Sequence, residues 1–195
     1  MDVSTVTLLY GLAAVVGIVA LIWLAVMVVA SRVSEPARYG FAGLRVRSSP
    51  YALAAAFGVA LLAMVGSLYF SEIAHYTPCT LCWYQRIAMY PLVLILGIAA
   101  WRRDLAVRLY AIPLAVIGAI VATYHYLLEW FPAIDTGACT MGIPCSQVWF
   151  RQFGFISLPL LALIAFLLVI AILLLPMSDT GWRADDDAPA EEAAD

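Results

Sequence analysis

Lysine is absent from this sequence of 195 residues, and charge of any kind is scarce. The ten basic residues are all arginine, and charged residues make up 12% of the chain, about half their usual share in a soluble domain. Hydrophobic residues make up 65%, which is more than a soluble fold of this size can bury. The composition therefore argues against a water-soluble enzyme, a nucleic-acid-binding protein and a disordered scaffold.

Long apolar runs dominate the sequence instead. A helix needs roughly 20 apolar residues to cross a hydrocarbon core. The runs are continuous rather than alternating, which favours helices over barrel strands. Five segments reach or approach the required length: Val6–Ala30, Tyr51–Phe70, Cys82–Trp101, Leu105–Leu128 and Phe155–Leu175. We therefore expect an all-α integral membrane protein that sits in a lipid bilayer.

The two ends of the chain differ from its middle. The first apolar segment lacks a preceding basic region and exceeds the usual length of a signal-peptide core, so it is interpreted as a retained helix. Residues 177–195 carry seven acidic residues and one arginine, a pattern typical of a disordered tail. The sequence thus predicts an extra N-terminal transmembrane helix with an Arg-rich linker (residues 1–50), a four-helix transmembrane bundle (51–176) and an acidic tail (177–195).

Arginine placement predicts the orientation in the membrane. Seven arginines lie between the first and second segments or between the third and fourth: Arg32, Arg38, Arg45, Arg47, Arg102, Arg103 and Arg108. Under the positive-inside rule both connections are cytoplasmic. The loops at 72–85 and 133–154 then face outward from a prokaryotic cytoplasmic membrane, and the C-terminus lies in the cytoplasm.

Cysteine is also rare, but all four cysteines fall in or beside the two outward loops. Cys79 and Cys82 precede or begin the third segment, and Cys139 and Cys145 lie between the fourth and fifth. The outer side is the oxidising one, where disulfides persist. Four cysteines allow three pairings, and the sequence alone does not choose among them.

The first two cysteines form a C-x-x-C motif at the expected start of a helix. Thr77 is expected to cap that helix, with Pro78 at its first position. A helix N-terminus favours a thiolate, and C-x-x-C cysteines placed there are often reactive. Arg86 follows Cys82 by four residues on the same helical face, where it could stabilise a thiolate or an anionic electron acceptor. The alternatives are a structural staple, with Arg86 reaching lipid headgroups, and a zinc site completed by His75.

The second pair lies in a turn-rich segment. An exposed disulfide between Cys139 and Cys145 would exchange readily with another protein's thiol, whereas the alternative is a loop staple. Trp149, Phe150 and Phe153 follow, and we expect them to form an amphipathic segment at the membrane interface.

His125 is a polar residue near the outer end of the fourth segment. Polar residues at membrane depth are costly and tend to mark sites. The imidazole could donate a hydrogen bond or a proton to a bound acceptor. The alternative is an interfacial residue held among aromatic neighbours.

Together these motifs resemble those of the disulfide bond formation protein B (DsbB) family, and its Bacillus-type relatives more closely. The resemblance covers about Tyr51 to Pro176 and is carried by Cys79-Thr80-Leu81-Cys82-Trp83-Tyr84-Gln85-Arg86, by Tyr124-His125 and by Cys139 and Cys145. It implies a membrane thiol–disulfide oxidoreductase that reoxidises a soluble DsbA-like protein of the thioredoxin fold. It further implies that the electrons pass to a membrane quinone, ubiquinone or menaquinone.

The resemblance also implies residue roles. Cys82 is similar in position to the family's quinone-adjacent cysteine, and Arg86 and His125 to its quinone-site residues. The redox-active disulfides would be Cys79–Cys82 and Cys139–Cys145. Cys139 would form the mixed disulfide with the partner, and Cys145 would pair transiently with Cys79.

Other classes of protein stay open at this point. A vitamin K epoxide reductase-like enzyme has a similar bundle, but its C-x-x-C follows the other cysteine pair instead of preceding it. A non-enzymatic membrane protein would hold structural disulfides or a metal, and a transporter would carry paired interior charges that no segment shows. The chain departs from the family in its added helix, its short Cys139–Cys145 interval and its acidic tail. The added helix either covers the quinone site or merely flanks the bundle.

Overall fold

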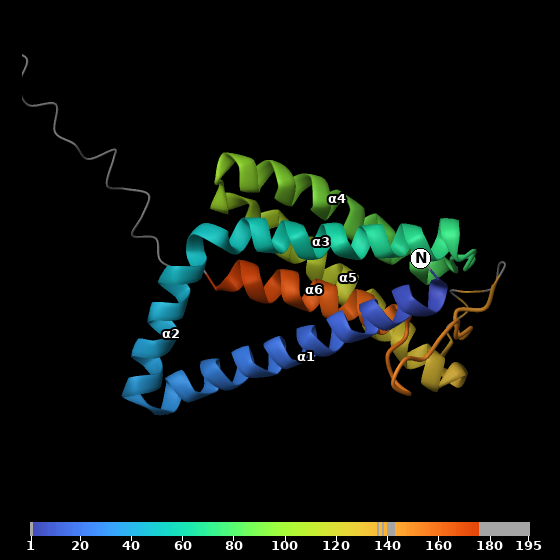
Figure 1. Ribbon diagram of the computed structural model, residues 1–195, viewed down its shortest axis with the longest axis horizontal. Coiled ribbons are helices and arrows are strands. Elements are labelled where there is room, and N and C mark those ends of the chain that lie inside the picture. The colour runs from blue at the N-terminus through green and yellow to red at the C-terminus, as the bar shows by residue number, and fades with distance from the viewer. Residues whose placement is uncertain (1, 136, 138, 140–142, 176–195) are drawn as a thin grey trace, which may run out of the picture.

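The computed structural model describes residues 2–135, 137, 139 and 143–175, and the predicted acidic tail lies outside them. The described residues form an all-α protein (Figure 1). Its α-helices are α1 (Val3–Val33), α2 (Glu35–Ser48), α3 (Ala52–Leu68), α4 (Thr80–Arg102), α5 (Arg108–Trp130) and α6 (Leu158–Leu174). The predicted all-α class is confirmed.

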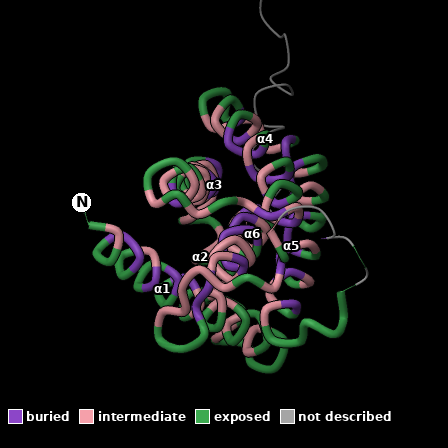
Figure 2. Tube along the Cα trace, turned by 90° about the vertical axis from the view of Figure 1, so that its right-hand side faces the viewer, coloured by how far each residue is buried: buried purple, intermediate pink, exposed green. Residues whose placement is uncertain are grey.

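Four of these helices form a closed bundle. Helix α3 packs against α4 and α6, and α5 packs against the same two helices, so the order around the bundle is α3–α4–α5–α6. The core between them consists of fully buried apolar side chains, among them Leu92 and Leu96 of α4 and Phe166 and Val169 of α6. Figure 2 shows the buried positions facing one another across this bundle.

The membrane-spanning prediction agrees with the helix lengths. The helical stretches Val3–Val33, Glu35–Ile73, Thr80–Arg102 and Leu105–Trp130 are long and apolar enough to cross a membrane, and α6 is a shorter apolar helix of 17 residues. A π-helical turn, Tyr69–Ile73, extends α3 at its outer end, and 3-10 turns begin α3 and α5. The chain is therefore a multi-pass membrane protein.

The Arg-rich connection between the first two segments is helical rather than an irregular linker. Helix α2 crosses the end of the bundle and joins α1 to α3 (Figure 1). It has no buried residue, and Arg38 forms an exposed ion pair with Glu35. Arg45 donates a hydrogen bond from Nε to the carbonyl of Leu175 at 2.8 Å, which ties α2 to the end of α6.

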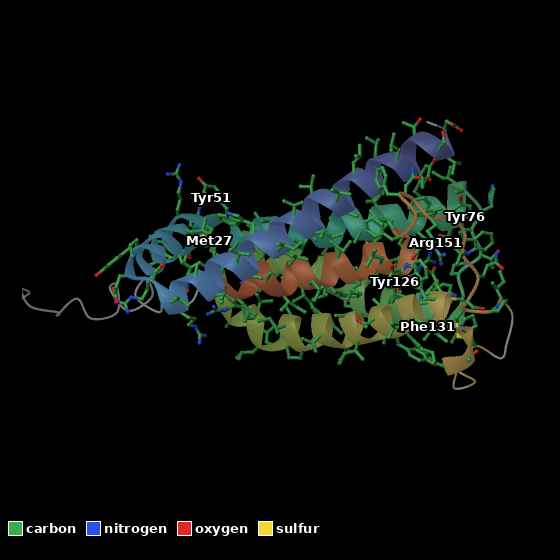
Figure 3. All side chains as sticks on the ribbon, turned by 90° about the horizontal axis from the view of Figure 1, so that it is seen from below. Met27, Tyr51, Tyr76, Tyr126, Phe131 and Arg151 are labelled. Atoms are coloured by element: carbon green, nitrogen blue, oxygen red, sulfur yellow. A yellow bond between two sulfur atoms is a disulfide. The ribbon has the colours of Figure 1, made fainter. Side chains whose placement is uncertain are left out.

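The opposite end of the bundle carries the aromatic loops. Figure 3 shows Tyr76, Tyr126, Phe131 and Arg151 near this end and Met27 toward the other. Tyr126 donates to the carbonyl of Phe155 at 3.0 Å, which ties α5 to the segment before α6. The arginine-rich connections and the cysteine-bearing loops thus lie at opposite ends, as the arginine pattern requires.

Helix α4 begins two residues later than the sequence predicts. Thr77 is not its cap; the N-cap is Cys79, whose backbone is extended and whose sulfur accepts a hydrogen bond from the backbone N–H of Cys82 at 3.4 Å. The thiol takes the place that a hydroxyl usually fills, because its sulfur lies over the free N–H groups of the first turn. The prediction of a Thr77 cap with Pro78 at the first position was therefore wrong.

The close contact between α5 and α6 can be tested at Gly118. A Cβ at this position would lie 2.2 Å from Cζ of the buried Phe166. Gly118→Ala should lower the free energy of unfolding by about 1–3 kcal/mol, because the overpacked ring has to move. Gly58→Ala is the matched control, since no atom lies within 4 Å of its Cβ position. Thermal unfolding of both variants in detergent measures the difference, and equal midpoints would contradict the described packing.

Candidate functional site

All four cysteines meet at one end of the bundle. Cys79 and Cys82 lie at the start of α4, and Cys139 and Cys145 form a disulfide in the loop between α5 and α6. Three of the four, Cys79, Cys139 and Cys145, are buried in one apolar cluster, and Cys82 packs against it. The common rim that the arginine pattern predicts for the two pairs is thus matched by direct packing between them.

The C-x-x-C pair is present as two free thiols whose sulfurs are 3.1 Å apart. The two residues face different surroundings. Cys79 is buried and contacts His125 and the second cysteine loop. Cys82 is only partly buried and lines the large cavity described below. The C-x-x-C pair therefore lies between the second cysteine loop and the cavity.

His125 is the buried side chain that connects the two cysteine pairs. Its Nε2 lies 3.6 Å from Sγ of Cys79 and 3.1 Å from the carbonyl oxygen of Cys145. Its Nδ1 lies 3.0 Å from Nε2 of Gln85, an amide nitrogen that can only donate. In this arrangement the neutral imidazole accepts at Nδ1 and carries its proton on Nε2, which donates toward Cys79 and Cys145.

These contacts make Cys79 acidic. The Cys82 thiol hydrogen-bonds to the Cys79 sulfur and is the largest influence, and the hydrogen bond from His125 acts in the same direction. Together they outweigh burial, which opposes ionisation, and lower the pKa of Cys79 to about 4. Cys79 is therefore a thiolate at neutral pH when the pair is reduced.

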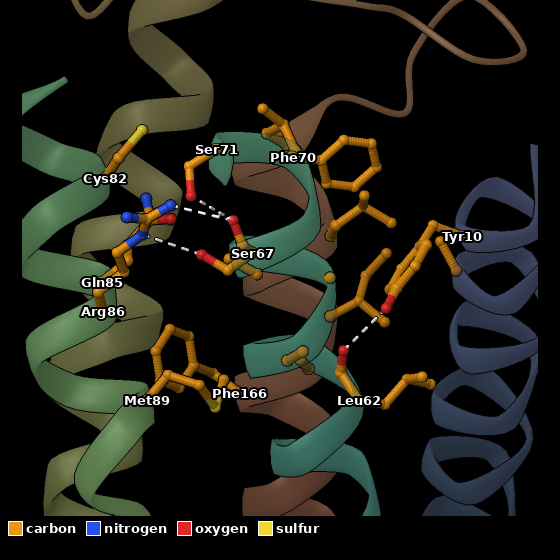
Figure 4. Close-up of a pocket in the computed structure, with 18 of the residues that line it drawn as sticks. Tyr10, Leu62, Ser67, Phe70, Ser71, Cys82, Gln85, Arg86, Met89 and Phe166 are labelled. Atoms are coloured by element: carbon orange, nitrogen blue, oxygen red, sulfur yellow. Dashed lines mark hydrogen bonds between the residues drawn. The ribbon is translucent and has the colours of Figure 1, made fainter. Parts of the chain in front are cut away.

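A cavity of about 190 Å³ lies beside Cys82, between α3 and α6. Its outer end carries polar groups from Ser67, Gln85 and Arg86, and its deeper part is lined by apolar side chains such as Met89 and Phe166 (Figure 4). A polar end and an apolar body suit an amphiphilic molecule with a polar ring and a hydrocarbon chain.

Arg86 is held in place at the polar end of this cavity. Its Nε donates to Oγ of Ser67 and its Nη2 to the carbonyl of the same residue, both at 3.0 Å. The guanidinium carbon also lies 5.2 Å from the ring centre of Trp83. Because two hydrogen bonds orient the guanidinium, a positive charge is fixed next to Cys82, on the helical face that the four-residue spacing indicates.

The predicted site residues divide between two environments. Arg86 and Cys82 line the cavity, whereas His125 does not appear among its lining residues and instead contacts Cys79. His75 is exposed, with a positive φ of 57°, at the outer end of α3. Arg86 and His125, which the resemblance places together at one site, thus lie in different surroundings.

Several residues of the site did not emerge from the sequence. Gln85 and Ser67, which hold His125 and Arg86, are uncharged and were not predicted as site residues, although Gln85 lies in the segment that begins with the C-x-x-C motif; their signal is a polar side chain within an apolar segment. Trp149 stacks on Tyr76 with ring centres 4.9 Å apart, and Phe150 packs on Phe70 at 5.3 Å. The expected interfacial segment at Trp149 and Phe150 is therefore part of an aromatic cluster that covers the outer end of the cavity.

The same cysteines and histidine could also hold a metal ion. The ligand atoms of Cys79, Cys82 and His125 lie within 4.8 Å of one another, and thiolate and imidazole are the ligands that Zn²⁺ prefers. The histidine placed for such a site is His125, not the His75 that the sequence suggests as a ligand.

Comparisons with known proteins agree with this geometry. A family model described as Disulfide bond formation protein DsbB matches residues 49–176. The chain is 53% identical over 124 residues to Disulfide bond formation protein C of Bacillus subtilis (strain 168), an alignment that covers 63% of this chain and 90% of that protein. It is 45% identical over 127 residues to a probable disulfide formation protein of Oceanobacillus iheyensis, covering 64% and 88%. No solved structure matches the chain significantly.

The acidity of Cys79 predicts an unusual pH dependence. In protein whose other pair is removed by Cys139→Ser and Cys145→Ser, ultraviolet thiolate absorbance should show one thiol ionising near pH 4, because the pKa of Cys79 is about 4. Cys82→Ala should raise the pH midpoint of Cys79 ionisation most, and His125→Ala should raise it less, because the hydrogen bond from Cys82 lowers the pKa of Cys79 more than that from His125 does. His75→Ala, which changes an exposed histidine, is the control.

The same shift has a consequence for stability. The folded pKa of Cys79 lies below that of an ordinary thiol, so its ionisation stabilises the reduced fold fully above the unfolded thiol pKa of roughly 8.5. This contribution is lost progressively as the pH falls toward 4. A His125→Ala titration identical to that of the parent protein would contradict the assigned contact.

Proposed function

Because the chain belongs to the DsbB family, we propose that this membrane disulfide-formation protein reoxidises a soluble DsbA-like partner of the thioredoxin fold and passes the electrons to a membrane quinone. The observation that carries the proposal is the position of Cys82, which lies in the C-x-x-C pair and also lines the amphiphile-shaped cavity. The Cys139–Cys145 pair packs in the same apolar cluster as Cys79. A path for electrons from a loop disulfide to a bilayer acceptor is thereby continuous.

The proposed orientation places the cysteine end outside the cytoplasmic membrane. The arginines of α2 and of the α4–α5 connection lie at the other end, which the positive-inside rule assigns to the cytoplasm. The partner then meets the Cys139–Cys145 disulfide in the oxidising compartment, and the C-terminus lies in the cytoplasm.

The relay begins at the second pair. A partner thiolate attacks Cys139, the S–S bond to Cys145 breaks, and a mixed disulfide forms with Cys139. The Cys145 thiolate then attacks Cys79 of the oxidised C-x-x-C pair, which forms a Cys79–Cys145 disulfide and releases Cys82 as a thiolate. The packing of Cys79 against Cys145 in one cluster supports this step without a large rearrangement of the loop.

The relay continues when the partner's second thiol displaces Cys139, which then attacks Cys145, so that the Cys139–Cys145 bond re-forms and Cys79 leaves as a thiolate. The two electrons then lie on the reduced Cys79 and Cys82 pair, and its disulfide would re-form only with the two-electron oxidant that a bound quinone would supply. A low thiol pKa favours departure in such exchange reactions, and His125 supplies part of that lowering for Cys79. We therefore assign His125 to the thiolate of Cys79, on the cysteine side of the site.

The acceptor side belongs to Cys82 and Arg86. A bound quinone supplies the two-electron oxidant, and the net change is partner dithiol plus quinone to partner disulfide plus hydroquinone. Arg86 stabilises the Cys82 thiolate and the negative charge that develops at the polar end of the cavity. Ser67 keeps the guanidinium in position for both tasks.

The role of Cys82 is tested with purified protein, a reduced DsbA-like dithiol protein and a short-chain quinone. Cys82→Ser should abolish quinone reduction, because no cysteine then lines the cavity. Cys139 should still be trapped in a mixed disulfide with the partner, since the second pair is unchanged. Full quinone reduction by Cys82→Ser would sink the proposal, and a stoichiometric metal in place of turnover would favour the metal-binding alternative.

The role of Arg86 separates binding of the acceptor from binding of the partner. Arg86→Met should raise the KM for quinone by about tenfold or more, because hydrogen bonds to a charged group are worth roughly 1.5–3 kcal/mol. The KM for the partner should change little. Arg102→Met, at the far end of the same helix, is the control. Equal quinone kinetics in both variants would remove Arg86 from the acceptor site.

A further inference from the structure

Helix α1 lies outside the region that the family model matches, yet it contributes to the acceptor cavity. The match begins at residue 49, after α1 and α2. Three residues of α1, namely Tyr10, Ala13 and Ala14, line the cavity together with α3, α4 and α6. The added helix therefore covers the site instead of merely flanking the bundle.

The position of α1 follows from the order of the helices around the bundle. Because α3 and α6 are neighbours in that ring, their seam is one lateral side of the bundle. The cavity lies along this seam, with α4 on one side of it and α1 on the other (Figure 4). In a bilayer, α1 is the element between this part of the cavity and the lipid.

Small residues hold α1 close to α6 and the loop before it. A Cβ on Gly17 would lie 2.8 Å from Cγ2 of Ile164, and one on Gly11 would lie 3.0 Å from Cγ of Gln152. Close approach at small residues is the usual basis of helix association in membranes, where apolar burial alone gives little preference. The buried residues of α1 all lie between Val6 and Gly17, beside the cavity.

Tyr10 is the large side chain of α1 at the cavity. Its hydroxyl donates to the carbonyl of Leu62 at 3.1 Å, and its ring meets Phe70 edge-on with centres 5.6 Å apart. The ring lies over Gly66, where a Cβ would come within 2.5 Å of its Cε1. Gly66 precedes Ser67, the residue that orients Arg86. Tyr10 therefore packs on the turn of α3 that also contributes Ser67 to the polar end of the cavity.

We propose that α1 is the lipid-facing wall of the acceptor cavity and that Tyr10 is a specificity-determining residue within it. This inference rests on the proposed function and concerns a quinone with an apolar chain. The ring of such a molecule fits the Arg86 end, and its chain runs along α6 beneath Ala13 and Ala14. Tyr10 closes the α3–α6 seam at the level of the ring, which slows escape of the molecule into the bilayer.

The first measurement uses no quinone. A variant that keeps Cys82 as its single cysteine is placed in lipid nanodiscs, and its alkylation by a bilayer-soluble pyrene maleimide is followed. The reagent reaches the Cys82 thiol from the lipid through the α3–α6 seam. Tyr10→Ala should raise the alkylation rate by about fivefold or more, because removing the ring opens the wall. Leu9→Ala, an exposed neighbour on α1 that does not line the cavity, is the matched control and should leave the rate unchanged.

The second measurement uses the full chain with all four cysteines. Tyr10→Ala should lower the quinone that co-purifies per protein and raise the KM for decyl-ubiquinone by about tenfold, whereas mixed-disulfide formation with the partner stays at the parent rate. Tyr10→Phe keeps the ring and should retain most of the quinone. Gly17→Leu, which pushes α1 from Ile164, should reproduce the effects of Tyr10→Ala through displacement of the whole helix.

The outcomes distinguish this inference from the proposed function. If Tyr10→Ala speeds alkylation of Cys82 but the parent protein neither binds nor reduces quinone, the role of α1 as the cavity wall is supported and the quinone function is overturned. If the parent protein binds and reduces quinone but Tyr10→Ala equals Leu9→Ala in every readout, the proposed role of α1 and Tyr10 is overturned and the proposed function stands. If Tyr10→Ala fails to fold, Tyr10→Phe and Gly17→Leu decide the matter by the same two measurements.

Discussion

The contact of one imidazole with both cysteine pairs is the interaction on which the rest of the site depends. His125 reaches the sulfur of Cys79 and the carbonyl of Cys145 with the same nitrogen, while Gln85 holds its other nitrogen. A buried polar group of this kind is stable only when its partners are in place. The loop between α5 and α6 is thereby brought against the first turn of α4, and the two cysteine pairs share one apolar cluster.

The two thiols of the C-x-x-C pair acquire different properties from this arrangement. Cys79 has the histidine and the second disulfide on its side, and its pKa is low because neighbouring hydrogen bonds favour the thiolate. Cys82 has the cavity and the guanidinium of Arg86 on its side. A pair with such unequal surroundings suits the proposed relay, in which one sulfur exchanges with protein thiols and the other faces a bilayer acceptor.

Much of the fold was predictable from hydropathy, but its details were not. The five apolar segments correspond to α1, α3, α4, α5 and α6, because continuous apolar runs have few structural alternatives in lipid. The Arg-rich connection was expected to be a linker and is the helix α2, which is held by the Arg45 bond to Leu175. The start of α4 was misplaced because a cysteine sulfur, rather than the more usual Thr77 hydroxyl, caps the helix.

The sequence by itself determined that the chain is a membrane protein, that its cysteines lie at one end of it, and that Arg86 shares a helical face with Cys82. These properties depend on composition and on spacing within one segment. Only the tertiary structure decided that His125 contacts Cys79, that Gln85 and Ser67 hold His125 and Arg86, and that Tyr10 of α1 lines the cavity. Those contacts join residues on different helices, and in a bilayer the choice of helix face depends on the fit of small and large side chains, which hydropathy does not encode.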